Sequence, residues 1–397
     1  MRILFLSQRV PFPPNRGDKI TTSKLIERMR RRHSVRCVAF SHGPEDDEGA
    51  RELEDMGVSI RTVPYHDLYA RVLAAPLLFT SKPLTLGAYG SSELQRIVDE
   101  EIAQADLAYA YSSSMGAFLE RHATKPRVMH FGELDSDKWR QYAERSALPM
   151  SWVYAREQRT LLEFERRVAR SFSENVVCTP LEQRVFQQQI PGASSVVLRN
   201  GVDLERFHPR ANEVLEGELV FTGVMNYLPN AEGCAWFARE ILPRIRAQRP
   251  QVRFSIVGSS PSREVERLAE LPGVRVTGSV PDTREYLRHA AVAVAPLRIA
   301  RGIQNKVLEA LAMGLPVVGT TPATQGVEGS AGRDYLVADE PEAFAAAVLQ
   351  LLAEPAHARE LAAAGRSFVE RNYDWEKVFA PLDGLLERCA APRSKNG

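Results

Sequence analysis

The sequence has little that marks a secreted, metal-binding or nucleic-acid-binding protein. Only 4 of its 397 residues are cysteine, and no two of them are close enough to form a Cys-x-x-Cys pair. This excludes a zinc framework of that type and a disulfide-rich scaffold, and it favours a reducing, cytoplasmic location. Neither sign of charge dominates, because 51 basic side chains stand against 50 acidic ones. We therefore expect no nucleic-acid partner.

Long hydrophobic runs are also missing. The first run has four apolar residues, Ile3 to Leu6, which is too short for the core of a signal peptide. The longest hydrophobic segment, VLAAPLLF at 72–79, is interrupted by Pro76. It is far shorter than the roughly 20 residues that span a bilayer. We expect a cytoplasmic protein whose only membrane contact is peripheral, from the surface.

What the sequence does contain is a regular alternation of short apolar runs and amphipathic segments. The apolar runs predict strands at 2–7, 35–40, 58–63, 107–111, 126–131, 175–179, 195–200, 218–223, 252–258, 274–278, 291–297 and 316–320. Amphipathic patterns such as 19–32, 92–105 and 156–172 predict helices between them. Alternating strands and helices are typical of α/β proteins with parallel sheets covered on both faces.

The length is that of two ordinary domains. Apolar periodicity lapses at 202–218, so we predict a first domain over 1–205 and a second over 206–372. The helical tail, 373–397, is predicted to pack back on the first domain. Two doubly wound, Rossmann-like domains that share a cleft would bind ligands beyond the carboxyl ends of their strands. No G-x-G-x-x-G follows a predicted strand, which argues against a dinucleotide dehydrogenase.

The most informative segment is APLRIARGIQNKVLEALAMGLPVVGT at 295–320. A buried strand is followed by a basic loop, and a helix predicted from Gln304 to Met313 is stopped by Gly314. The first turn of such a helix offers free N–H groups and a positive dipole end, which suit a phosphate, and Lys306 adds a charge there. Glu309, one turn further on, could accept two hydrogen bonds from a ribose diol. The alternative is a plain Lys306–Glu309 ion pair on a solvated helix face.

Several segments resemble group 1 retaining glycosyltransferases of GT-B fold. GIQNKVLEALAMGLPVV at 302–318 is similar to their donor-nucleotide segment, and NGVDLERFHP at 200–209 is similar to their interdomain stretch. VRVTGSVPDTREYLRHAAVAVAPLR at 274–298 resembles their nucleotide-base loop with the helix and strand after it. RILFLSQRVPFPPNRGDKI at 2–20 resembles their first strand and glycine loop. ELDSDKWRQYA at 133–143 further resembles a subgroup of exosortase-linked exopolysaccharide transferases.

The resemblance implies transfer of a sugar with retention, from a nucleotide-diphosphate donor that acts as co-substrate, with no cofactor and no metal. Donor-binding positions are implied at Gly17, Gly223, Asn226, Gly258, Val280, Arg298, Arg301, Gly302, Ile303, Gln304, Asn305, Lys306 and Glu309. Catalytic roles are implied for His130, Arg301, Lys306 and Glu309. The base would lie near the loop after Gly278.

The chain departs from the family pattern in two places. The family usually shows Glu-x7-Glu, and counting back from Glu309 places Arg301 at the first position. The family also usually has an Arg and a Lys after the first strand of the second domain, whereas GVMNYLPNAEG at 223–233 has no basic residue. The charge of the leaving diphosphate would then be met by Arg298, Arg301 and Lys306.

The first domain offers weaker candidates. Gly17 would allow close approach of a phosphate or sugar, while Asp18 could serve the cleft or simply cap a helix. His130 ends a predicted strand, where it could meet sugar hydroxyls or be structural. Asp135 and Asp137 form a D-x-D, a weak match to metal-binding motifs. We interpret Asp18, Asp135, Lys138 and Trp139 as acceptor-side or structural.

The helix at 24–32 carries a basic stripe that includes Lys24, Arg28 and Arg31. A solvated face is one interpretation, and a dock for anionic lipid headgroups or a lipid-diphosphate acceptor is the other. We favour the dock, because the apolar segment 71–88 could supply a neighbouring hydrophobic contact.

We therefore predict a glycosyltransferase that acts on a glycan or lipid-linked acceptor in exopolysaccharide or cell-surface polysaccharide synthesis. A nucleotide-sugar epimerase of the same fold would turn over a donor without an acceptor. A non-catalytic sugar-nucleotide-binding protein would bind the donor and never turn it over. A periplasmic-type binding protein, which also has two α/β lobes, is disfavoured by the absence of a recognisable signal sequence.

Overall fold

The computed structural model describes residues 1–209 and 215–391 and divides the chain into two compact units. The first unit comprises Met1–Arg199 together with the described residues from Phe379 on, and the second comprises Asn200–Val378. Residues 210–214, which belong to the predicted boundary segment, and residues 392–397 of the predicted tail lie outside the described residues.

The first unit is built on a parallel sheet of seven strands in the order β3-β2-β1-β4-β5-β6-β7. Its strands are β1 (Arg2–Ser7), β2 (Ser34–Ser41), β3 (Ser59–Pro64), β4 (Leu107–Tyr111), β5 (Arg127–Gly132), β6 (Glu174–Val177) and β7 (Val196–Val197). β1 pairs with β2 from Arg2↔Ser34 onward and with β4 from Ile3↔Leu107 onward. The chain moves outward from β1 to β3 and returns to the other side of β1 with β4, so the sheet is doubly wound.

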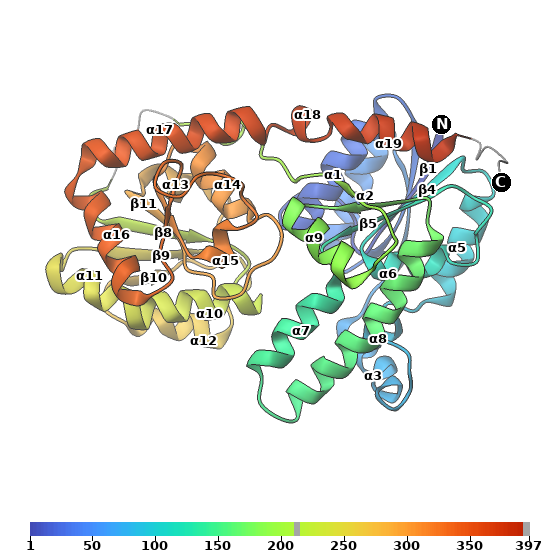
Figure 1. Ribbon diagram of the computed structural model, residues 1–397, viewed down its shortest axis with the longest axis horizontal. Coiled ribbons are helices and arrows are strands. Elements are labelled where there is room, and N and C mark those ends of the chain that lie inside the picture. Colours follow the sequence, from blue (N-terminus) through green and yellow to red (C-terminus); the bar gives the residue numbers. More distant parts are fainter. Residues whose placement is uncertain (210–214, 392–397) are drawn as a thin grey trace. The chain divides into compact units, whose positions relative to one another are not determined.

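The helices of the first unit cover both faces of this sheet (Figure 1). They are α1 (Gly17–Arg30), α2 (Pro44–Asp55), α3 (Asp67–Ala74), α4 (Leu84–Ala88), α5 (Ser92–Ile102), α6 (Ser113–Gly116), α7 (Asp135–Arg145), α8 (Met150–Ser171), α9 (Pro180–Gln189) and α19 (Ala380–Ala390), with 3₁₀ turns η1 (Ala75–Phe79) and η2 (Ala117–Leu119). The C-terminal α19 is tied to α1 by an ion pair between Arg28 Nη2 and Asp383 Oδ2 at 2.8 Å.

The second unit repeats the design with six parallel strands in the order β10-β9-β8-β11-β12-β13. They are β8 (Glu218–Thr222), β9 (Arg253–Val257), β10 (Val274–Val276), β11 (Val292–Ala295), β12 (Val317–Gly319) and β13 (Leu336–Val337). The helices are α10 (Leu228–Trp236), α11 (Leu242–Gln248), α12 (Arg263–Arg267), α13 (Arg284–His289), α14 (Asn305–Ala312), α15 (Thr321–Thr324), α16 (Pro341–Ala353), α17 (Pro355–Asn372) and α18 (Trp375–Val378), with a π-helical turn η3 (Phe237–Ile241) and a 3₁₀ turn η4 (Leu268–Glu270).

The prediction of an α/β chain with two doubly wound parallel sheets is confirmed. The central strands are buried on both faces, as β1 and β8 illustrate, which explains why they are near-continuous apolar runs in the sequence. In the second unit the direction of winding reverses between β8 and β11. The carboxyl ends of these two strands are where such a sheet binds ligands.

Candidate functional site

The N-terminus of α14 lies beside the reversal point of the second sheet. The loop from Pro296 to Gln304 leads from β11 into α14, and Gln304 occupies the N-cap position without a capping side-chain bond. The backbone N–H groups of Asn305 and Lys306 donate to no other described residue. Asn305 Oδ1 is buried without a hydrogen-bond partner among the described residues. The helix start therefore offers two donors and one acceptor to a ligand.

Lys306 is the cation of this helix start. Its Nζ donates to Asn230 Oδ1 at 3.2 Å and to Gln304 Oε1 at 3.4 Å, and it lies 5.2 Å from the centre of the Phe221 ring. No carboxylate lies within ion-pair distance of it in the described parts of the chain. Burial lowers the pKa of Lys306 to about 8, although the charge of Glu309 raises it. An ammonium held by neutral amides keeps its charge available to an anion.

Asn230, in α10, places this ammonium at the carboxyl end of β8. Asn230 is only 4% exposed, and its Nδ2 donates to the carbonyl of Val224 at 2.9 Å, which leaves Oδ1 for Lys306. Gly223 makes room for the pair, because a Cβ there would lie 2.7 Å from Asn230 Nδ2 and 3.5 Å from Lys306 Cε. The segment 223–233 has no basic residue of its own, yet it positions one that α14 supplies.

Glu309 lies one helical turn beyond Lys306. Its carboxylate forms no hydrogen bond or ion pair with any described residue. Burial raises the pKa of Glu309, while the charges of Lys306 and Arg206 lower it. The alternative of a Lys306–Glu309 ion pair is thus not formed, and the carboxylate can accept hydrogen bonds from a ligand.

The two arginines of the loop lie in different surroundings. The guanidinium of Arg298 lies 5.9 Å from the centre of the Trp236 ring in the third turn of α10. The carbonyl of Arg301 accepts a hydrogen bond from Gln304 Nε2 at 2.8 Å, which fixes the end of the loop next to α14. Arg301 is thus tied through its carbonyl to Gln304, the residue just before the free N–H groups, whereas Arg298 lies against α10.

The carboxyl ends of β8, β9 and β10 are joined through glycines. Gly258 has φ +148°, and a Cβ there would lie 1.7 Å from the carbonyl oxygen of Gly223. The N–H of Gly258 donates to the carbonyl of Gly278 at 3.3 Å. Only glycine allows this close approach. Near this edge Asn226 is exposed, Val280 packs against the core and Ile303 is buried.

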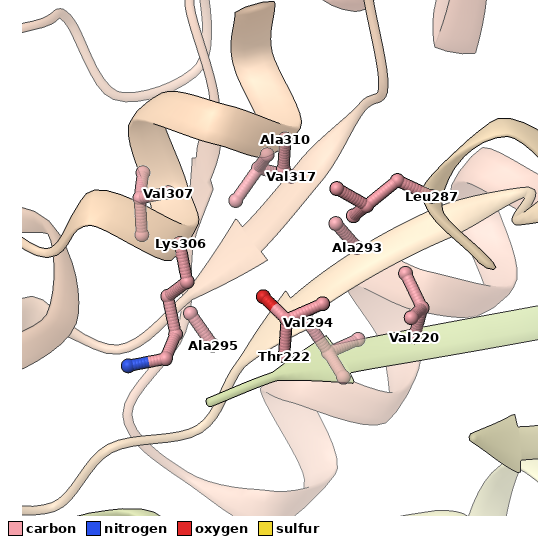
Figure 2. Close-up of a pocket in the computed structure, with 10 residues that line it drawn as sticks. All are labelled: Val220, Thr222, Leu287, Ala293, Val294, Ala295, Lys306, Val307, Ala310 and Val317. Carbon is pink, nitrogen blue, oxygen red and sulfur yellow. The ribbon is translucent and has the colours of Figure 1, made fainter. Parts of the chain in front are cut away.

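A small apolar cavity lies beneath Lys306, between α14 and the sheet (Figure 2). Its volume of about 10 Å³ has room for about one water molecule, so it cannot hold a nucleotide. Figure 2 shows the amine of Lys306 pointing away from the apolar residues that line this cavity. The candidate ligand surface is therefore the open edge above the cavity.

In the first unit, His130 is almost completely buried. Its Nδ1 lies 2.6 Å from Tyr109 Oη, and burial lowers the pKa of the imidazole to about 3. The ring is therefore neutral at physiological pH. Its Nε2 forms no hydrogen bond with another described residue, which leaves one ring nitrogen for a ligand.

The side chains of the D-x-D sequence are occupied by internal partners. Asp135 accepts hydrogen bonds from Ser113 Oγ and Lys138 Nζ, both at 2.8 Å, and Asp137 pairs with Arg140. Burial would raise the pKa of Asp135, but Lys138 and Ser113 hold it below its usual value. No group of three or more potential metal ligands occurs in the described part of the chain.

Three other first-unit predictions are placed as follows. Trp139 stacks on Tyr154 at 5.4 Å, where it helps α7 pack against α8. Gly17 is the first residue of α1, and Asp18 in its first turn pairs with Arg16 at 2.7 Å and with Arg9 at 3.8 Å. Asp18 therefore lies among cations beside the end of β1.

The basic stripe on α1 already has protein partners. Lys24 pairs with Glu27, while Arg28 and Arg32 both pair with Asp383 of α19. Arg30 donates to the carbonyl of Met56. These contacts engage most of the charge that we assigned to lipid headgroups.

Comparison with protein families finds a similarity in the second unit. Residues 216–354 match the family model of group 1 glycosyl transferases. The second unit is therefore similar to this family over most of its length. The match covers β8 to α16 and thus includes Gly223, Asn230 and the whole of α14.

Curated relatives and solved structures of other proteins extend the similarity beyond this segment. Glycogen synthase of Mycobacterium tuberculosis is 25% identical over 60% of this chain, and the amylovoran biosynthesis glycosyltransferase AmsK of Erwinia amylovora is 24% identical over 58%. The chain spans 59% and 60% of the lengths of these two relatives. The Anabaena protein HepE, solved with UDP and glucose, is 16% identical with a TM-score of 0.70 over 98% of this chain and 99% of its own.

The structural likeness to such enzymes confirms the predicted GT-B fold. The family resemblance is confirmed at the level of group 1 glycosyl transferases, whereas the exosortase-linked subgroup stays a prediction. No helix among the described residues is long and apolar enough to cross a membrane.

Sequence reasoning missed one residue of the candidate site in the second unit, Asn230. The only available signal was its place in the first turn of a helix that follows a buried strand. That position is typical of ligand-binding residues in α/β sheets, but a single uncharged Asn does not by itself predict a binding site.

Proposed function

We propose that the chain is a glycosyltransferase that moves a sugar from a nucleotide-diphosphate donor to a hydroxyl of a glycan or lipid-linked acceptor. The observation that carries the proposal is the N-terminus of α14, where free N–H groups, a cation without a carboxylate partner and a carboxylate without a partner follow one another. This arrangement lies within the segment that matches group 1 glycosyl transferases.

Each part of this helix start meets a different part of the donor. The N–H groups of Asn305 and Lys306 and the ammonium of Lys306 would bind the diphosphate, and Glu309 would accept hydrogen bonds from the ribose diol. The base would lie near the glycine-linked ends of β9 and β10. These assignments agree with the order diphosphate, ribose and base along a nucleotide.

Charge develops on the diphosphate as the sugar leaves, so donors that are fixed beforehand lower the barrier. Lys306 is fixed by Asn230 and Gln304, and Arg301 follows Ala300, whose carbonyl is bonded to Gln325 Nε2 at 3.0 Å. We propose that these groups take the place of the Arg and Lys that 223–233 lacks. Retention of configuration is inferred from the family resemblance; in that chemistry a donor phosphate oxygen can accept the proton of the acceptor hydroxyl.

On the acceptor side we propose the carboxyl edge of the first sheet, with Asp18 and the neutral ring of His130 as contacts for hydroxyl groups. The relative AmsK, named for amylovoran biosynthesis, supports a role in surface or exopolysaccharide synthesis. UDP in the neighbouring HepE structure supports a uridine nucleotide as the first donor to test.

The test is release of nucleoside diphosphate from UDP-, GDP- and ADP-sugars, with and without bacterial membrane and polysaccharide extracts. We expect turnover that requires an extract. Glu309→Gln should raise the KM for the donor about 10- to 100-fold, as expected for loss of charge-assisted hydrogen bonds. The matched control is Glu270→Gln, an exposed residue before β10 and hence at the opposite edge of the sheet.

Turnover of the donor without any acceptor would instead indicate an epimerase or a hydrolase. Donor binding without turnover under all conditions would indicate a binding protein. A Glu309→Gln variant with the donor KM of the wild type would refute the ribose assignment.

A further inference from the structure

The first unit exposes large apolar side chains in only two places among its described residues. One is the segment 68–79, in α3 and η1, and the other is the segment 148–152, at the start of α8. Their members are Leu68, Tyr69, Val72, Leu73, Phe79, Leu148, Met150 and Trp152. Phe79 is 87% exposed and Leu148 is 79% exposed, and exposed apolar side chains that gather in this way mark interaction sites. We call these eight residues the apolar lobe.

The two segments belong to one surface because α8 holds them together. Arg156 of α8 donates to the carbonyls of Leu78 and Lys82, and Glu157 accepts the N–H groups of Leu84 and Thr85 at 2.7 and 2.8 Å. Arg156 and Glu157 are both buried. Figure 1 shows α3 and the hairpin of α7 and α8 on the same side of the first sheet.

These contacts also show that the apolar lobe is not a poorly packed loop. The chain uses a buried ion pair and several hydrogen bonds to fix the backbone between Leu77 and Thr85. A buried pair of this kind is costly unless it is fully bonded, so it fixes a definite conformation. The exposed Phe79 therefore belongs to a segment whose backbone is fixed by α8.

Exposed cations accompany the apolar lobe. The side chains of Lys82, Arg145 and Arg159 are exposed, and their charged groups have no hydrogen-bonded or ionic partner among the described residues. Glu144, beside them, is already paired with Arg140. Asp67 is the exposed acid of α3. The surface therefore combines apolar and aromatic side chains with an excess of unpaired positive charge.

We propose that the apolar lobe docks on the surface of a bilayer that contains anionic phospholipids. Apolar side chains bury in the interface, Tyr69 and Trp152 suit its polar boundary, and the three cations meet lipid phosphates. A symmetric dimer through this surface would instead bring the same cations of two copies together, which disfavours it. The proposal places docking at the lobe and not at the basic stripe of α1.

The position of the apolar lobe in the fold relates docking to the proposed acceptor side. The apolar lobe follows β3 and β5, so it emerges from the carboxyl edge of a parallel sheet. The loop after β1 that leads to Asp18 emerges from the same edge. A protein bound through the lobe would hold this edge close to the headgroups, where a lipid-linked hydroxyl lies.

The experiment is co-sedimentation of the full chain with vesicles of phosphatidylcholine alone and of phosphatidylcholine mixed with phosphatidylglycerol. We expect binding to the mixed vesicles that weakens as salt is raised. Phe79→Ser and Leu148→Ser should each reduce vesicle binding about fivefold or more, because each removes apolar area from the interface. The control Leu215→Ser, an exposed leucine of the second unit, should bind like the wild type.

A triple variant, Lys82→Gln with Arg145→Gln and Arg159→Gln, should lose the preference for phosphatidylglycerol. Nucleotide binding, measured on the same proteins, should not change in any of these variants, so failure of docking is distinguished from failure of the proposed function. Absence of vesicle binding by the wild type, or equal binding by Leu148→Ser and Leu215→Ser, would overturn the proposal. So would a dimer in light scattering that Leu148→Ser dissociates, because the lobe would then be a protein interface.

Discussion

Lys306 allows a quantitative prediction, because its ammonium is part of the proposed diphosphate site and yet its pKa is low. Burial brings the pKa from 10.5 to about 8 in the ligand-free protein. A bound diphosphate stabilises the charged form, so the protonated lysine binds it more tightly than the neutral lysine does. At pH 9 only about one tenth of the molecules carry that proton, so the apparent Kd for a nucleoside diphosphate should be about tenfold weaker than at pH 7.5.

Two variants separate this effect from other titrations. Lys306→Arg keeps its charge at every pH tested, and its affinity should change little between pH 7.5 and about 9. Lys306→Met should bind about 10- to 100-fold more weakly and should also lose the pH dependence. Calorimetric titration with UDP at several pH values measures all three proteins. Equal affinity of the wild type at both pH values, or wild-type affinity in Lys306→Met, would refute the reasoning.

The same pKa has a consequence for stability with the opposite sign. The folded pKa lies below the unfolded value of 10.5, so folding opposes the charged form. The free energy of unfolding should therefore rise as the pH increases from about 8 to 10.5. At neutral pH, Lys306→Met should stabilise the ligand-free protein by about 1 to 3 kcal/mol, which thermal unfolding would detect.

Two further predictions concern folding. Gly258→Ala should destabilise the protein by about 2 kcal/mol or more in urea unfolding, because its Cβ would meet the carbonyl of Gly223. Gly332 also has a positive φ, of +81°, but a Cβ there would meet open space, so Gly332→Ala should lose less stability. Burial raises the pKa of Glu165 in the folded protein to about 8, so the free energy of unfolding of the wild type should fall as the pH rises from 4.5 to 8. Glu165→Gln should abolish this fall. The exposed neighbour Glu163→Gln serves as its control, and a pH profile unchanged by Glu165→Gln would contradict this explanation.

The fold was predictable from the sequence because parallel strands buried on both faces are continuous apolar runs. The sequence analysis did not predict β13, which consists of Leu336 and Val337. α14 was predictable from the glycine and proline that follow it and from the short buried strands on either side. These signals are local, and they do not depend on how the elements pack.

The parts that could not be predicted depend on contacts between distant residues. Asn230 and Lys306 are 76 residues apart, and only the approach of α10 to α14 brings them together. Arg28 pairs with Asp383, which is 355 residues away in the chain. The sequence alone therefore did not show that the basic stripe has acidic partners. The apolar character of 71–88 was visible, but not which of its side chains remain exposed.

The measurement that tests the central claim most directly is calorimetric titration of the wild type and of Glu309→Gln with UDP, GDP and ADP at pH 7.5. The claim that the start of α14 binds the donor nucleotide predicts one site per chain for one of these nucleotides and a large loss of affinity in Glu309→Gln. Binding of none of them, or equal binding by both proteins, would contradict it.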